Sequence, residues 1–127
     1  MPVPFAINGI GRMGRALVRI ARERPELELV AVNDLAGADQ LASLLAHDSL
    51  HGRFSGEVAV EDDNLVIDGR RIATYGQADS GRIPWEETGA RIVVDATGGC
   101  LDRELALAHL RGPVKKVLVS ANATGLD

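Results

Sequence analysis

The chain has 127 residues, a hydrophobic fraction of 46% and a formal net charge of −4, which fits one globular domain around a single hydrophobic core. The acidic balance argues against a nucleic-acid surface, and no apolar run is long enough to span a membrane. With one cysteine and no signal-peptide pattern at its start, the chain has no intramolecular disulfide and is expected to be cytoplasmic.

The first 34 residues alternate between strand and helix patterns. Val3–Ile7 predicts a buried parallel strand, Arg12–Arg24 an amphipathic helix that Pro25 ends, and Glu28–Asn33 a second strand. Four apolar residues recur at helical spacing in the helix and are expected to face the sheet: Met13, Leu17, Ile20 and Ala21.

A glycine motif lies between the first strand and this helix. Gly9 permits a tight turn, Gly11 lets a pyrophosphate approach the backbone, and Gly14 allows the helix to pack closely on the strand. Arg12 adds a positive charge at the helix start, where free N–H groups attract phosphate. Asp34 follows the second strand and is suited to bind ribose hydroxyls, so the pattern predicts NAD rather than NADP. The alternative is an ordinary glycine-rich turn with Asp34 as a cap.

The remaining sequence continues the alternation. A helix is expected at Asp39–His47, with Asp39 as its N-cap, followed by a loop at Asp48–Phe54. A β-hairpin and then a strand, a helix and a strand complete the pattern: Glu57–Val60, Asn64–Ile67, Arg71–Tyr75, Arg91–Asp95, Asp102–Leu110 and Lys115–Ser120. We therefore predict an α/β fold, a Rossmann-type doubly wound, mostly parallel sheet with a β-hairpin insert.

Several blocks resemble one family in their order and spacing. They are Ile7-Asn8-Gly9-Ile10-Gly11-Arg12-Met13-Gly14-Arg15, Ala31-Val32-Asn33-Asp34-Leu35, Asp48-Ser49-Leu50-His51-Gly52-Arg53-Phe54, Ile83-Pro84-Trp85, Asp95-Ala96-Thr97-Gly98 and Lys115-Lys116-Val117-Leu118-Val119-Ser120-Ala121. Together they make the chain similar to the N-terminal NAD-binding domain of glyceraldehyde-3-phosphate dehydrogenase. The chain departs from the family at Ala78, Cys100 and Asn122, where Arg, a bulky residue and Pro are common.

The resemblance implies NAD as cofactor and assigns roles along it. Asn8, Gly9, Gly11, Arg12 and Met13 would form the pyrophosphate cradle. The other cofactor-binding residues would be Asn33 and Asp34 at the adenosine ribose, Thr97 and Gly98 near the centre and the nicotinamide ribose, and Ser120 and Ala121 beside the nicotinamide.

The resemblance also implies that the reacting cysteine and histidine belong to a catalytic domain that these residues do not include. We expect residues 1–127 to form one NAD-binding domain that binds cofactor and lacks a catalytic residue of its own. Cys100 suggests a structural role rather than a nucleophile, and Trp85 is expected to be a packing residue. The three histidines show no metal-site spacing, and His51 is expected to form a hydrogen bond within its loop. Two alternatives remain: a free-standing nucleotide-binding or interaction module, and an enzyme of the erythrose-4-phosphate dehydrogenase type.

Overall fold

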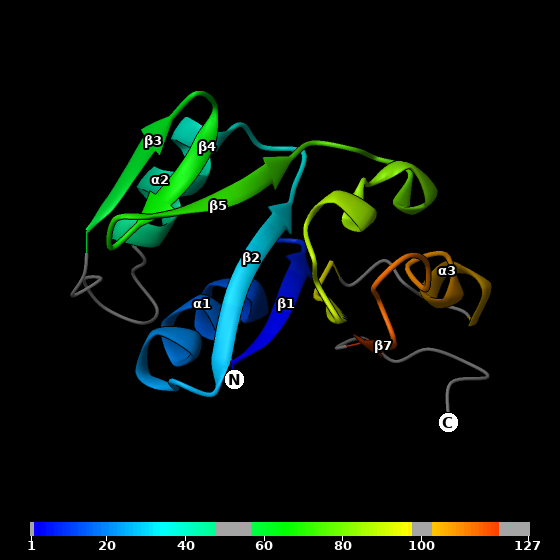
Figure 1. Ribbon diagram of the computed structural model, residues 1–127. Helices are drawn as coiled ribbons and strands as arrows, with labels where there is room; N and C mark the ends of the chain where they lie inside the picture. The colour runs from blue at the N-terminus through cyan, green and yellow to red at the C-terminus, as the bar shows by residue number, and fades with distance from the viewer. Residues whose placement is uncertain (1, 48–56, 98–102, 120–127) are drawn as a thin grey trace.

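A computed structural model describes residues 2–47, 57–97 and 103–119 (Figure 1). The strands are β1 (Val3–Asn8), β2 (Leu27–Asn33), β3 (Val58–Glu61), β4 (Asn64–Ile67), β5 (Arg70–Tyr75), β6 (Ile92–Asp95) and β7 (Lys116–Val119). The helices are α1 (Arg12–Glu23), α2 (Ala38–Ala46) and α3 (Arg103–Leu107), and two short 3-10 turns lie at Ser80–Arg82 and Trp85–Glu87.

The strands form one sheet in the order β3-β4-β5-β2-β1-β6-β7. β5, β2, β1, β6 and β7 run parallel to one another, and β3, β4 and β5 are joined as antiparallel neighbours. This confirms the predicted Rossmann-type sheet and its hairpin insert. In Figure 1, α1 and α2 lie on the same side of the sheet, and α3 lies at the β7 end.

Tight turns connect the hairpin strands. Asp62 and Asp63 have φ of 51° and 62° between β3 and β4, and Asp68 and Gly69 have φ of 52° and 80° between β4 and β5. Two successive left-handed residues make the kind of turn that matches the twist of paired strands. The hairpin predicted from Asn64–Ile67 and Arg71–Tyr75 is therefore confirmed.

Helix α1 presents a different stripe to the sheet from the one predicted. Gly14 and Val18 are buried, whereas Met13 and Ile20 are 50% and 47% exposed. The reason is a close contact: a Cβ on Gly14 would lie 2.2 Å from the Gly9 carbonyl oxygen, so Gly14 must face the strand. The buried face of α1 is consequently shifted by about one residue from the predicted face, and Leu17 still packs against the core.

Helix α2 also begins differently from the prediction. Its N-cap is Gly37, and Asp39 lies in the first turn, so the prediction of Asp39 as the cap was wrong. A carboxylate in the first turn still interacts favourably with the positive end of the helix dipole.

Two apolar clusters hold the opposite faces of the sheet. One joins α1 and α2 to the sheet through residues such as Val18, Leu41 and Leu45. The other packs Ile83 and Trp85 against the opposite face. The central strands β1 and β2 are therefore buried on both sides, as expected for the middle of a parallel sheet.

Candidate functional site

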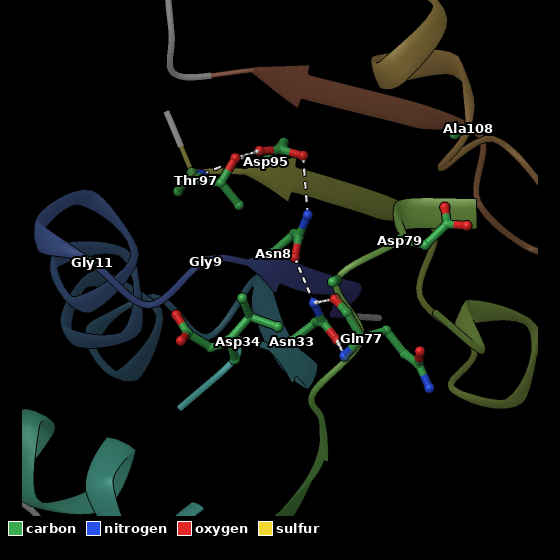
Figure 2. A pocket seen from close by; sticks show the side chains of 13 residues that line it. Asn8, Gly9, Gly11, Asn33, Asp34, Gln77, Asp79, Asp95, Thr97 and Ala108 are labelled. Atoms are coloured by element: carbon green, nitrogen blue, oxygen red, sulfur yellow. Dashed lines mark hydrogen bonds between the residues drawn. The ribbon is translucent and has the colours of Figure 1, made fainter. Parts of the chain in front are cut away.

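A cleft opens where the parallel strands end at their carboxyl termini (Figure 2). Its volume is about 640 Å³. Its lining comes from segments far apart in the sequence: Asn8, Gly9, Gly11, Asn33, Asp34, Leu35, Gln77, Ala78, Asp79, Asp95, Ala96, Thr97 and Ala108. Open parallel sheets bind their ligands at this edge, so the cleft is the natural candidate site.

The turn after β1 forms one wall of the cleft. Gly9 has φ of 98°, and a Cβ there would lie 2.8 Å from the backbone nitrogen of Thr97. Only glycine fits that conformation and that contact. At Gly11, by contrast, an added Cβ would meet nothing within 4 Å, so open space lies against this part of the backbone.

The amino end of α1 follows this turn directly. Gly11 is the N-cap and provides no side-chain cap, while its carbonyl accepts the N–H of Arg15 at 2.9 Å. The N–H groups of the first helical turn have no carbonyl partner within the helix, and no acidic residue lies in that turn. Arg12 and Met13 lie here as exposed residues, but they are not part of the cleft lining. The geometry suits an anion, since the positive end of the helix dipole lies here and Arg12 adds a positive charge to the same turn.

Asp34 is held in a defined orientation at the end of β2. Its Oδ2 accepts the N–H of Ile10 at 2.7 Å, and its Oδ1 accepts the N–H of Ala36 at 3.0 Å. Each carboxylate oxygen has a second lone pair, so the group can still accept hydrogen bonds from a ligand's hydroxyl groups. The bond to Ile10 also ties Asp34 to the glycine turn.

Asn8 and Asn33 lie in the cleft wall, and their side chains are committed to each other. Both residues are buried, and Nδ2 of Asn33 donates to Oδ1 of Asn8 at 2.8 Å. Asn33 also exchanges hydrogen bonds with the backbone of Gln77, donating at 2.9 Å and accepting at 2.9 Å. The Nδ2 of Asn8 donates to Asp95 at 3.1 Å. Figure 2 shows these side chains side by side across the strand ends.

Asp95 is a buried carboxylate at the end of β6. Burial raises the pKa of this carboxyl, but hydrogen bonds donated by His109, Thr97 and Asn8 outweigh it and leave the pKa below its ordinary value. His109 contacts Asp95 Oδ2 at 2.8 Å and accepts the indole N–H of Trp85 at 3.0 Å. Because the indole N–H can only donate, Nδ1 of His109 carries no proton and Nε2–H donates to Asp95.

The structure brings together six of the residues expected to bind the cofactor, since Asn8, Gly9, Gly11, Asn33, Asp34 and Thr97 all line the cleft. Gly98, Ser120 and Ala121 lie outside the described residues, as do the loop at 48–54, Cys100 and Asn122. Trp85 is fully buried against the sheet, which confirms its packing role.

Sequence reasoning missed Gln77 and Asp95 as parts of this wall, and it missed His109 as the hydrogen-bond partner of Asp95. A signal for Asp95 was present, because a polar residue ends the apolar run Ile92-Val93-Val94 at the ligand-binding edge. His109 falls within the predicted helix Asp102–Leu110, but its contact with Asp95 depends on how that segment packs against β6. The contribution of Gln77 comes from its backbone and leaves no trace in the sequence.

The fold and the cleft together define a dinucleotide-binding domain of the α/β class. Residues 3–103 match the family model described as the NAD binding domain of glyceraldehyde 3-phosphate dehydrogenase. The chain belongs to this family, and NAD is the cofactor of the domain.

Relatives in several organisms agree with this assignment. The chain is 46% identical over 127 residues to glyceraldehyde-3-phosphate dehydrogenase of Geobacillus stearothermophilus, covering 100% of this chain and 38% of the relative. It is 45% identical over 122 residues to the protein of that name in Yarrowia lipolytica, covering 95% and 36%. It is 44% identical over 127 residues to glyceraldehyde-3-phosphate dehydrogenase 1 of Bacillus subtilis, covering 100% and 38%. The chain thus spans little more than a third of these relatives.

Among residues 2–47, 57–97 and 103–119, no helix has the length and apolar character needed to cross a bilayer. Within the same ranges, no cluster of histidine, cysteine, aspartate and glutamate has the arrangement of a metal site.

Proposed function

We propose that this chain is the cofactor-binding part of a phosphorylating glyceraldehyde-3-phosphate dehydrogenase, forming one domain, and that the reacting cysteine and histidine lie in a further domain. The observation that carries the proposal is the cleft, which combines the glycine turn, the start of α1 and Asp34 in one place. NAD would accept a hydride from the substrate there. The residues of this chain bind and orient the cofactor. The single cysteine fits a reducing compartment, and we propose the cytoplasm.

The adenosine end of NAD is assigned to the Asp34 side of the cleft. The free lone pairs of Asp34 would accept hydrogen bonds from the ribose hydroxyls, and its charge would repel a 2′-phosphate. Asn33 lies beside it, and its buried side chain supports a role in holding this wall rather than in direct contact with the ribose.

The pyrophosphate is assigned to the backbone from Asn8 to Met13. The open space at Gly11 supports a close approach of phosphate, and the first-turn N–H groups of α1 would donate to it. Gly9 would supply the turn that brings these groups together. Arg12 would add positive charge from the rim of the site.

The nicotinamide end is assigned to the opposite side of the cleft. Thr97 lies at the carboxyl end of β6, where it supports a contact near the centre of the cofactor. Gly98, Ser120 and Ala121 remain the proposed contacts on this side, on the strength of the family pattern.

Calorimetric titration of the 127-residue chain with NAD, NADP and ADP-ribose tests the proposal. We expect binding of NAD and ADP-ribose with one site per chain and much weaker binding of NADP. Asp34→Ala should weaken NAD more than NADP, and Gly11→Val should abolish NAD binding while circular dichroism shows an intact fold. A folded wild-type chain that binds neither NAD nor ADP-ribose would refute the proposal.

A further inference from the structure

The last residues of three neighbouring parallel strands form a polar row, defined here as Asp95, Asn8 and Asn33. Asp95 of β6 is in register with Asn8 of β1, and Asn8 is in register with Asn33 of β2. Their exposed fractions are only 2%, 5% and 3%. Side-chain hydrogen bonds of 3.1 and 2.8 Å link Asp95 to Asn8 and Asn8 to Asn33.

The polar row continues beyond the strands at both ends. On the β5 side, the side chain of Asn33 donates a hydrogen bond to the backbone carbonyl of Gln77 and accepts one from its N–H. On the β7 side, Asp95 holds His109, which in turn accepts from Trp85. Asp95 also accepts the N–H of Thr97 at 3.2 Å and its hydroxyl at 2.7 Å. The turns that line the cleft are therefore tied to one chain of hydrogen bonds.

The side-chain hydrogen bonds that begin at Trp85 and at Asn33 both lead toward Asp95. Trp85 donates to His109, which makes His109 a donor to Asp95, and Asn33 donates to Asn8, whose own amide donates to Asp95. Only a carboxylate can accept from both directions and from Thr97 at the same time. An amide at position 95 would turn an N–H₂ group toward either Thr97 or the pair formed by Asn8 and His109.

We propose that Asp95 is a positioning residue for the cofactor site, acting through the polar row to fix the turns that contact NAD. The inference rests on the proposed function, because it assumes that NAD occupies this cleft. Two sets of contacts connect Asp95 to the residues that line the cofactor site. Asp95 fixes the backbone of Thr97, on which Gly9 packs with no room for a Cβ. Asp95 also fixes the amide of Asn8, which orients Asn33 at the residue before Asp34.

The first test compares Asp95→Asn with Asp68→Asn, a matched control at an exposed hairpin turn. We expect Asp95→Asn to raise the Kd for NAD about tenfold, as the loss of a charge-assisted hydrogen bond would, with one site per folded chain retained. Asp68→Asn should leave the Kd unchanged. A purely structural role would lower the unfolding midpoint of Asp95→Asn and leave the Kd of the folded protein at the wild-type value, which would overturn the inference.

The second test uses His109, which does not line the cleft. A glutamine at this position can accept from Trp85 and donate to Asp95, whereas leucine can do neither. We expect His109→Gln to keep NAD affinity within about threefold of the wild type and His109→Leu to weaken it about tenfold. Emission from Trp85, the single tryptophan, reports whether its hydrogen bond persists. Equal Kd values for the two variants would contradict the inference.

If Asp95→Asn does not fold, the comparison of His109→Gln with His109→Leu tests the positioning role. Wild-type binding separates this inference from the proposed function. A wild-type chain that binds no NAD refutes both. A wild-type chain that binds NAD, together with variants that bind equally well, refutes only the positioning role.

Discussion

At the scale of single residues, the two glycines at the start of the motif have different physical duties. Gly9 needs its left-handed φ of 98° and its contact with Thr97, whereas Gly11 has open space around it. The same substitution at the two positions should therefore have separate effects on folding and on binding.

We predict that Gly9→Ala destabilises the fold by about 1–3 kcal/mol, because strain at a positive φ adds to the clash with Thr97. Gly11→Ala should change stability by less than about 1 kcal/mol, the ordinary cost of alanine at an N-cap. Urea unfolding followed by circular dichroism measures both. Equal losses for the two variants would show that the turn after β1 is not strained.

Asp95 also predicts how stability depends on pH. Its folded-state pKa lies below the value of 3.8 that applies to an ordinary aspartate, because hydrogen bonds outweigh burial. A lowered pKa means that its stabilisation is complete above the unfolded value and is lost as pH falls through the folded value. The stability difference between wild type and Asp95→Asn should thus be constant from pH 5 to 7 and shrink below about pH 4. Urea titrations at each pH measure this, and a constant difference down to pH 2 would contradict it.

The sequence predicted individual site residues by position more readily than by role. The strand and glycine pattern located Asp34 at the carboxyl edge of the sheet, and the family resemblance located Asn8 and Asn33 there. The hydrogen bond between the side chains of Asn8 and Asn33 depends on the register between β1 and β2. The residue pattern of a single strand does not specify this register. The place of Asp95 at the β6 end of the polar row required the same information.

At the scale of elements, an ion pair between Arg22 and Asp68 joins helix α1 to the hairpin. Asp68, in the β4–β5 turn, accepts from Arg22 at 2.5 Å and from the N–H of Glu57 at 3.0 Å. These bonds lower the pKa of Asp68, the bond from Arg22 most of all. The carboxylate is partly exposed, so the pair contributes less than about 1 kcal/mol.

The two hairpin turns should respond differently to glycine. Asp63 sits at φ of 62°, and Asp63→Gly should stabilise the domain by up to about 1 kcal/mol because it removes strain at a position that favours glycine. Asp68→Gly relieves similar strain but removes the bond to Arg22, so its net effect should be smaller or destabilising. Thermal unfolding of the two variants measures the contrast, and a larger gain for Asp68→Gly would refute it.

Most elements were predictable because they depend on local patterns. Alternation and turn residues located the hairpin, and apolar runs located β1, β2 and β6. The inward face of α1 was not predictable from apolar spacing, since the contact between Gly14 and the Gly9 carbonyl decides it. A residue without a side chain does not appear in a hydrophobic pattern.

At the scale of the whole molecule, the sheet joins two apolar clusters into one unit. Leu41 lies in the cluster beneath the helices, and Ile83 lies in the cluster on the opposite face, and both are fully buried. Strands shared by the two clusters should make them unfold together.

Leu41→Ala and Ile83→Ala should each cost about 2–5 kcal/mol, as large-to-small changes in a packed core do. Each should shift one transition in which circular dichroism and Trp85 fluorescence coincide. Trp85 lies in the same cluster as Ile83, so it reports directly on that face. If Ile83→Ala moved the fluorescence transition alone, the two faces would be independent units.

Pairing between β1 and β2 contains one irregularity. Phe5 is opposite Leu29, whereas Ala6 is opposite Ala31, so Val30 has no paired residue in β1. Leu29 and Val32 face the helix-side cluster, while Val30 and Ala31 face the other. Because the irregularity accommodates the extra residue, Asn8 is paired with Asn33 at the cleft.

Strand β2 therefore consists of two segments, before and after Val30, whose alternation of side chains between the two faces of the sheet differs by one residue. Val30 is the spacer between them. Removing one residue from a central strand normally turns every later side chain to the wrong face. Deletion of Val30 should instead bring the two segments into phase and leave Asp34 at the cleft, so the shortened chain should fold and bind NAD. Circular dichroism and NAD titration measure this. Loss of binding in a folded deletion variant would show that the spacer itself shapes the site.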